Sequence, residues 1–257
     1  MMKKNKNLKS LVLLACSFFI CTALFAKTPL NHYVLIKTDK GECLLKLYNE
    51  TPKHRDNFVK LVKTGYYDNL LFHRVINNFM VQGGDPDSRN AAPKQELGNG
   101  GPEYKIMSEI QEGLFHKKGT IGAARDNNPA KESSASQFYL VQGKKFTEAG
   151  LDSLETLRMQ GKKFSAAQRA AYTTIGGTPH LDGNYTVFGE LLRGIPTVDA
   201  IAVVKTDSKD RPVEDVHMSM KLLTRREALN LEREAAGLKP KTGFFTKLGD
   251  MFSSKYY

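Results

Sequence analysis

The sequence lacks the motifs on which metal-dependent, nucleotide-binding and nucleophilic enzymes depend. Its six histidines show no paired ligand spacing. Its 21 glycines complete neither a phosphate-binding loop nor the G-x-S-x-G turn that presents a nucleophilic serine. We therefore expect neither a bound metal nor a cofactor.

Cysteine is scarce, and tryptophan is absent. Of the three cysteines, Cys16 and Cys21 lie in an N-terminal apolar run, and only Cys43 lies beyond it. A single thiol cannot form a disulfide within the chain, so cysteine usage says nothing about the compartment.

The N-terminal apolar run, residues 11–26, is short for a membrane span, which needs about 20 residues. Four lysines precede it, and a basic head before a short apolar run predicts a signal peptide over residues 1–26. We therefore expect an exported protein of the periplasm or cell envelope. The alternatives are a retained N-terminal membrane anchor and lipidation at Cys16, which ends a Leu-Leu-Ala-Cys tetrapeptide.

Positive charge prevails over negative charge. Lysine and arginine number 38 against 27 aspartates and glutamates, which gives a net charge of +11. The excess is spread along the chain, and no nucleic-acid-binding motif accompanies it. We interpret it as solvated surface charge and expect no nucleic-acid partner.

Most apolar residues beyond the leader fall in short β-prone runs. Residues 32–38 and 42–48 flank Asp39-Lys40-Gly41, which favours a hairpin turn. Further strand-like runs occupy residues 71–76, 79–82, 120–124, 137–141, 186–191 and 216–222. So many short strands favour a closed antiparallel barrel over a parallel sheet.

One helix is predicted between the second and third strands, over residues 51–65. Thr51 is expected to cap it, Pro52 suits its first turn, and Gly65 is expected to end it. Phe58, Leu61 and Val62 form its apolar stripe.

Two segments depart from the strand pattern. Residues 147–174 are predicted to form a helical insert, whose second half Ser165 can cap. Residues 224–257 are predicted to form an amphipathic helical tail. Its apolar stripe consists of Phe244, Phe245, Leu248, Met251 and Phe252. The stripe either packs on the barrel or contacts a membrane surface or a partner's groove.

Three blocks of the sequence resemble the signature blocks of the cyclophilins. They are FHRVINNFMVQGGD at 72–85, SQFYLVQG at 136–143 and LDGNYTVFGELLRG at 181–194. GNGGPEYKI and GTIGAAR also fit, in the form seen in bacterial members. The resemblance covers roughly residues 33–223 and leaves the insert and the tail outside the family pattern.

The resemblance implies a mainly β protein with one isomerase domain over residues 27–223. Its fold would be a closed eight-stranded antiparallel barrel with capping helices, to which this chain adds the helical insert and the helical C-terminal tail. Its activity would be peptidyl-prolyl cis–trans isomerisation of proline-containing unfolded or exported polypeptides. We expect it to act as a monomer.

This reaction needs no nucleophile, because no bond breaks. Rotation about a peptide bond faces a barrier of about 18–20 kcal/mol, because resonance gives the C–N bond double-bond character. In the twisted amide the prolyl nitrogen regains a lone pair. A fixed cation that donates a hydrogen bond to that nitrogen therefore stabilises the transition state more than the ground state.

The resemblance implies that Arg74 is that cation, and that Gln82 is the second catalytic residue. Gln82 and Gln137 are expected to hold peptide carbonyls and to position Arg74. Gly83 and Gly84 are expected to let the chain turn tightly beneath the pocket.

The remaining residues that the resemblance implies are substrate contacts. The pocket for the proline ring would consist of Phe79, Met80, Tyr139 and Leu181. Contacts to the substrate backbone would come from Ala124 and Arg125. The rim would be formed by His73, His180 and Tyr185.

Three of these residues depart from the family pattern. Tyr139 stands where phenylalanine is usual, so its hydroxyl must reach water or find a partner. His180 stands where many members have tryptophan, and Tyr185 where histidine is common. The rival hypothesis is a non-catalytic proline-binding holdase, which would have no use for a cation at the amide nitrogen.

Overall fold

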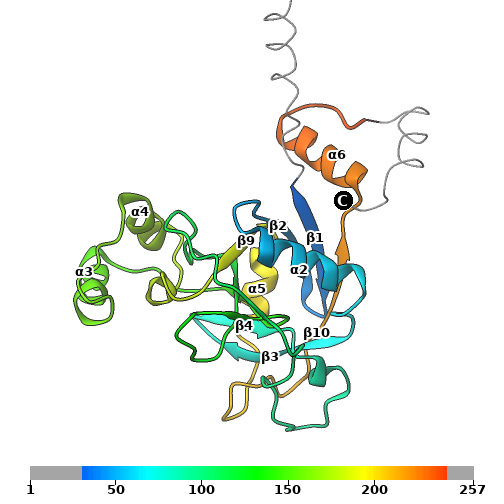
Figure 1. Ribbon diagram of the computed structural model, residues 1–257, viewed down its shortest axis with the longest axis horizontal. Helices are drawn as coiled ribbons and strands as arrows, with labels where there is room; N and C mark the ends of the chain where they lie inside the picture. Colours follow the sequence, from blue (N-terminus) through cyan, green and yellow to red (C-terminus); the bar gives the residue numbers. More distant parts are fainter. Residues whose placement is uncertain (1–30, 242–257) are drawn as a thin grey trace, which may run out of the picture. The chain divides into compact units, whose positions relative to one another are not determined.

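The computed structural model describes residues 31–241. The predicted signal peptide and the predicted apolar stripe of the tail lie outside this range. Eight strands close into a barrel in the order β1-β10-β3-β4-β8-β6-β9-β2 (Figure 1). Every neighbouring pair is antiparallel, which confirms the predicted barrel.

The strands closely match the runs predicted from the sequence. Their bounds are His32–Thr38 (β1), Gly41–Leu47 (β2), Leu70–Ile76 (β3), Met80–Gly83 (β4), Thr120–Ala123 (β6), Phe138–Val141 (β8), Val187–Arg193 (β9) and His217–Leu222 (β10). The hairpin between β1 and β2 turns at Asp39 and Lys40, as predicted, and pairs Thr38 with Gly41. Gly41 has a φ of +131°, which favours glycine.

Two helices contribute apolar side chains to the barrel core. Helix α2 (Pro52–Lys63) packs against β9 and β10, and α5 (Ile195–Ala202) packs against β2, β3 and β4. The ring of Phe58 in α2 lies 5.7 Å from that of Phe138 and 5.4 Å from that of Phe188, measured between centroids. Val198 and Ile201 of α5 are fully buried in the same core cluster.

The sequence did not predict α5 or several shorter elements. These are a two-stranded sheet of β5 (Lys105–Ile106) and β7 (Ser133–Ser134) and the 3₁₀ turns η1 (Pro86–Asn90) and η2 (Pro179–Leu181). Helix α5 has eight residues and is mostly apolar, so it shows little of the amphipathic spacing that identifies a helix in a sequence.

The predicted cap of α2 was wrong, although the bounds of the helix were close to the prediction. The side chain of Thr51 makes no capping hydrogen bond, and its buried hydroxyl has no partner within residues 31–241. Glu109 takes the role from a distant loop. Its two carboxylate oxygens accept the backbone amides of Lys53 at 3.0 Å and His54 at 2.9 Å.

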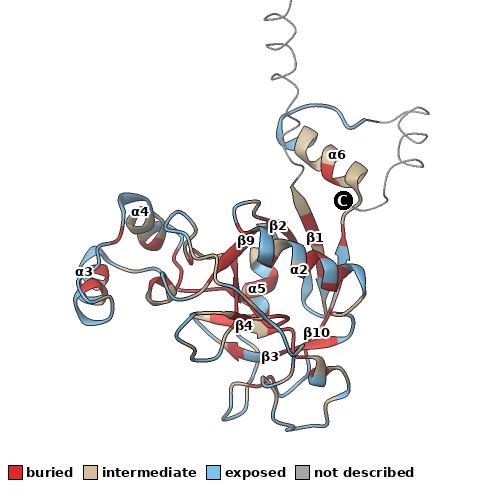
Figure 2. Ribbon diagram, viewed as in Figure 1, coloured by how far each residue is buried: buried red, intermediate tan, exposed pale blue. Residues whose placement is uncertain are grey.

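The insert forms a helical pair beside the barrel, α3 (Glu148–Leu157) and α4 (Ala166–Thr174) (Figure 1). Ser165 caps α4 in a reciprocal box with Gln168, as the sequence predicted for Ser165. Leu151, Phe164 and Tyr172 form a small core separate from that of the barrel. Figure 2 shows that the remaining residues of the pair are mostly exposed or half-buried.

Arg169 of α4 forms ion pairs with three acidic residues of α3. Its guanidinium nitrogens lie 2.7 Å from Glu148 and Asp152 and 2.8 Å from Glu155, measured to carboxylate oxygens. Glu155 is buried, and it also accepts the backbone amide of Phe164. The insert therefore has its own apolar and ionic stabilisation.

The described part of the tail is helix α6 (Arg225–Ala235), capped by a reciprocal box of Thr224 and Glu227. Glu232 accepts hydrogen bonds from the Asn31 amide at 2.8 Å and the Tyr33 hydroxyl at 3.0 Å. This part of the tail is thus bonded to the first strand of the barrel. Among residues 31–241, each helix is too short or too polar to span a bilayer.

Replacing Glu109 with alanine is expected to lower the free energy of unfolding by about 1–2 kcal/mol, because two amides of α2 lose their acceptor. Thr51→Val should change it little, since valine keeps the side-chain shape and removes only a hydroxyl that bonds to nothing described. Urea unfolding followed by circular dichroism measures both. A greater loss for Thr51→Val than for Glu109→Ala would contradict this account of the cap.

The contribution of Glu109 should depend on pH. Burial raises the pKa of its carboxyl, but hydrogen bonds from the His54 ring and the amides of Lys53 and His54 outweigh burial and lower it. The stabilisation is therefore present above the unfolded-state pKa of about 4.3 and is lost as the pH falls through the lower folded-state value. The difference between wild type and Glu109→Ala should shrink over that range.

Candidate active site

A cavity of about 560 Å³ opens beside β3 and β4. The predicted site residues that line it are His73, Arg74, Phe79, Met80, Gln82, Ala124, Arg125, Tyr139, Leu181 and Tyr185. Gln137 and His180 do not line it. The structure therefore brings together most of the residues that the sequence blocks suggested.

A row of cross-strand partners places three of these side chains on the cavity wall. Arg74 on β3 pairs with Gln82 on β4, and Gln82 pairs with Tyr139 on β8. Directly paired residues of neighbouring strands project from the same face of a sheet. Tyr139 in turn pairs with Gly122 on β6, where an added Cβ would lie 2.3 Å from Cζ of Tyr139. Gly122 therefore leaves room for the tyrosine ring.

Arg74 is half-exposed and lies beside an acid. Its side chain is 44% exposed, and Nε lies 3.5 Å from the Asp210 carboxylate. The sequence predicted that Gln82 and Gln137 would position Arg74, but the two glutamines bond to each other and to a glycine-rich loop. Gln82 Nε2 donates to Gln137 Oε1 at 3.0 Å, and Gln137 Nε2 donates to the carbonyls of Gly98 and Gly100.

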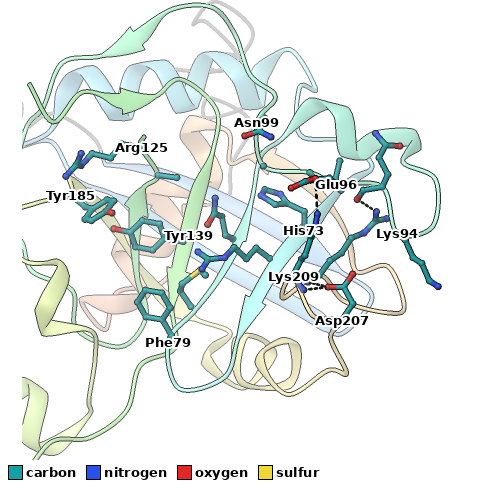
Figure 3. A pocket seen from close by; sticks show the side chains of 18 of the residues that line it. His73, Phe79, Lys94, Glu96, Asn99, Arg125, Tyr139, Tyr185, Asp207 and Lys209 are labelled. Atoms are coloured by element: carbon teal, nitrogen blue, oxygen red, sulfur yellow. Dashed lines mark hydrogen bonds and ion pairs between the residues drawn. The ribbon is translucent and has the colours of Figure 1, made fainter. Parts of the chain in front are cut away.

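Aromatic rings form one half of the cavity, as Figure 3 shows for Phe79, Tyr139 and Tyr185. Tyr139 and Tyr185 meet edge to face, with centroids 6.0 Å apart. The Arg125 guanidinium lies over the Tyr185 ring at 4.8 Å, and Arg125 Nε donates to the Asn184 carbonyl. His180 stacks on Phe79 at 5.3 Å, so it supports the apolar wall from outside.

The opposite half of the cavity is charged, and the sequence analysis missed it. Glu96 and Lys209 form an ion pair of 2.9 Å between two loops (Figure 3). Arg211 donates to the carbonyls of Ala92 and Gln95, which fixes one loop against the other. No motif marked these loops, and only the run of charged residues at 207–211 could have drawn attention to them.

Of the two glycines predicted to form a tight turn beneath the pocket, Gly83 is the last residue of β4, and only Gly84 has a left-handed backbone. Gly84 has a φ of +95°, and an added Cβ would lie 2.2 Å from the carbonyl oxygen of Ser136. The next residue, Asp85, is fully buried and accepts the backbone amides of Gly98 and Gly100. Asp85 therefore anchors the glycine-rich loop at the cavity edge, a role that its sequence position did not reveal.

His73 is buried at the cavity, and neither ring nitrogen has a hydrogen-bond partner within the described residues. Its pKa is lowered to about 4, chiefly by burial; the Asp85 carboxylate opposes this shift, and the charges of Arg74 and Arg211 add to it. The ring is thus neutral near pH 7. It cannot supply a proton there.

The hydroxyl of Tyr139 has a partner inside the protein. It lies 2.8 Å from Nε2 of His116, and the two rings are nearly parallel with centroids 5.9 Å apart. Of the two possibilities that the sequence left open, the structure shows the buried partner rather than water. His116 was not singled out from the sequence.

A second hollow of about 450 Å³ adjoins the first. The residues that line both are Gln82, Gly98, Asn99, Ala124 and Arg125. Its own walls include the segment 100–105 and Gln137. A chain leaving the aromatic cavity would pass into this hollow across Ala124.

Comparison with known proteins agrees with this geometry. Residues 33–221 match the model of the family "Cyclophilin type peptidyl-prolyl cis-trans isomerase/CLD". A Staphylococcus haemolyticus protein, named as a candidate peptidyl-prolyl cis–trans isomerase, is 36% identical over 71% of this chain and 86% of its own length. A Staphylococcus epidermidis protein of the same name is 38% identical over 71% of this chain and 87% of its own length.

Solved structures show the same fold. A cyclophilin-type isomerase from Cryptosporidium parvum superposes with a TM-score of 0.54 at 23% identity, covering 75% of this chain and 97% of that one. A second structure of that protein, determined in the presence of the dipeptide Ala-Pro, gives a TM-score of 0.52 at 24% identity and covers 73% of this chain and 96% of that one.

The buried state of His73 gives a titration that can be measured. Its ring proton in an NMR titration should show one inflection near the folded-state pKa of about 4 and none near the ordinary value of about 6.5. Because the unfolded state binds the proton more tightly, this residue should reduce stability as the pH falls from about 6.5 toward the folded-state value. His73→Gln assigns the signal, and an inflection near pH 6.5 would show that the ring is solvated.

Proposed function

The chain belongs to the cyclophilin-type peptidyl-prolyl cis–trans isomerases, and we propose that Arg74 accelerates rotation by hydrogen bonding the prolyl nitrogen of the twisted amide. The observation that carries this proposal is the row of Arg74, Gln82 and Tyr139 across three neighbouring strands. The row sets a guanidinium beside an aromatic wall at a fixed spacing.

The aromatic half of the cavity suits the proline ring. Phe79, Met80, Tyr139 and Leu181 present apolar surface, which holds a pyrrolidine without competing for the hydrogen bonds of its amide. When the proline ring is held there, rotation about the X-Pro bond moves the residue that precedes the proline. Binding energy at the ring then serves to orient the bond that must twist.

Asp210 contributes by restricting Arg74. An arginine side chain on a surface samples many rotamers, and ordering it during the reaction would cost free energy. The Asp210 carboxylate at 3.5 Å from Nε limits that freedom before substrate arrives. Guanidinium stays charged at any physiological pH, so the donor is always available.

We propose proline-containing polypeptides in extended, accessible form as the substrates. The aromatic cavity takes the ring, and the adjoining hollow offers space for neighbouring residues of the chain. The Cryptosporidium parvum relative crystallised with Ala-Pro supports a prolyl peptide as the ligand class. The charged loops at the opposite side face the solvent around the peptide.

Arg74→Ala is expected to lower kcat/KM for a prolyl test peptide by on the order of 100-fold, as the loss of a transition-state donor does. The matched control is Arg193→Ala, which removes the same charge from an exposed position on β9 outside the cavity. It should retain wild-type activity. Binding of a proline peptide, measured by calorimetry, should persist in Arg74→Ala.

Two outcomes would contradict the mechanism. Unchanged kcat/KM in Arg74→Ala would remove Arg74 from the reaction. Proline-peptide binding without isomerase activity in the wild type would instead favour the holdase hypothesis, in which the cavity binds but does not catalyse.

We further propose that the isomerase acts on proteins in the periplasm or cell envelope. The support is the basic head and apolar run of residues 1–26. Slow X-Pro isomerisation limits the folding of many chains and requires no energy source to accelerate. An exported isomerase would therefore serve newly translocated proteins.

N-terminal sequencing of the protein purified from its own cells tests the export proposal. Cleavage after Ala26 should give a first residue of Lys27. An intact N-terminus would indicate a retained anchor or an unexported protein. A blocked chain that begins at a lipid-modified Cys16 would indicate lipidation.

A further inference from the structure

A buried chain of hydrogen bonds links the proline cavity to the helical insert. It begins at the Tyr139 hydroxyl, 2.8 Å from Nε2 of His116. Nδ1 of His116 lies 2.7 Å from one oxygen of the Asp182 carboxylate. The other oxygen accepts the Gln168 amide at 2.9 Å and the Tyr172 hydroxyl at 2.5 Å, and both of these residues belong to α4.

The direction of each bond follows from Asp182. An ionised carboxylate only accepts hydrogen bonds, so Nδ1 of His116 must carry the proton that faces it. In neutral imidazole the other nitrogen then accepts, and Tyr139 must donate to it. The backbone amide of His116 also donates to Asp182, at 2.9 Å, which fixes the ring relative to the acid. Asp182, at one end of this hydrogen-bond chain, therefore determines that Tyr139 donates at the other end.

Most side chains of this hydrogen-bond chain are buried, although Asp182 and Gln168 also line a hollow of about 400 Å³. His116 and Tyr172 are fully buried, and Tyr139 and Asp182 are 4% and 8% exposed. Burial raises the pKa of Tyr139 and Tyr172 well above that of a free phenol, and Asp182 adds to the effect at both. Both hydroxyls thus remain protonated.

Tyr139 also has little room to move within the cavity wall. Its ring lies parallel to His116 on one side, meets Tyr185 edge to face and occupies the space that Gly122 leaves. A phenylalanine would be held by packing alone. The hydroxyl adds a directional bond, and that bond depends on how His116 is held.

The insert should survive the loss of one hydroxyl. Its apolar cluster and the ion pairs of Arg169 do not pass through Asp182. The bonds from Gln168 and Tyr172 to Asp182 are additional contacts, directed away from the insert toward the segment that carries the cavity wall.

We propose that Gln168 and Tyr172 of the insert are positioning residues for isomerisation, acting through Asp182 and His116 on Tyr139. In this proposal the insert holds the Tyr139 ring at the depth that fits a proline. It rests on the proposed function, because it concerns the same cavity. It assigns to the insert a role in substrate binding that the family blocks do not contain.

The test is a double-mutant cycle on Tyr139→Phe and Tyr172→Phe. Tyr172→Phe alone should lower kcat/KM for a prolyl peptide by on the order of threefold to tenfold, mainly by raising KM. In the Tyr139→Phe background the same substitution should have no effect, because the hydrogen-bond chain then no longer reaches the cavity. This non-additivity separates positioning through the chain from general destabilisation.

The protein offers a matched control in Tyr33→Phe, outside the hydrogen-bond chain. Tyr33 is also a buried tyrosine whose hydroxyl donates to a carboxylate, that of Glu232, but it lies at the first strand beside α6. It should leave kcat/KM unchanged. A second variant, Gln168→Glu, keeps an acceptor for the amide of Ser165 in the cap of α4 but replaces the donor to Asp182 with a charge. It should act in the same direction as Tyr172→Phe.

A structural readout keeps the proposal testable if a double variant fails to fold. In protein labelled with ¹³C on tyrosine rings, Tyr172→Phe should shift the Tyr139 signals, and Tyr33→Phe should not. Equal losses of kcat/KM in both Tyr139 backgrounds, or unmoved Tyr139 signals, would overturn the proposal. The proposed function fails separately, through an unchanged rate in Arg74→Ala, because Arg74 is not part of this chain.

Discussion

The register between β3, β4 and β8 is the constraint on which the site depends. It puts Arg74, Gln82 and Tyr139 in one row on one face. A slip of one residue in β4 would turn Gln82 toward the opposite face and bring a core residue to the cavity. Closure of the barrel prevents such slips, because each strand is paired on both edges and the core fixes which residues point inward.

The cavity combines two environments that one stretch of chain could not supply. Strands contribute Arg74, Met80 and Tyr139, whose positions follow from the pleat of the sheet, whereas Phe79, Leu181 and Tyr185 come from turns beside the strands. Loops contribute Asp210, Glu96 and Lys209, whose contacts join segments far apart in the sequence. A cation beside an apolar wall is costly to arrange unless a counter-charge and solvent remain near it. Half-exposed Arg74 beside Asp210 satisfies this condition.

Local sequence rules failed where a distant group offered a stronger bond. Thr51 occupies a favourable capping position, but Glu109, with two charged oxygens, accepts the helix amides instead. Gln82 and Gln137 were expected to hold Arg74, but Gln82 donates to Gln137, and Gln137 donates to the glycine-rich loop. The hydrogen-bond chain from Tyr139 through His116 and Asp182 to Tyr172 also joins distant residues, whose proximity no local sequence pattern predicts.

The sequence by itself determined the eight barrel strands, the helix after the second strand and the helical insert, and its resemblance to the cyclophilins identified the aromatic half of the cavity. These follow from alternation, capping residues and the content of short blocks, which act over a few neighbours in the chain. The tertiary structure decided the partners: Asp210 for Arg74, Glu109 for α2 and His116 for Tyr139. Such pairings depend on which segments the closed barrel brings within bonding distance, and that distance has no local signature.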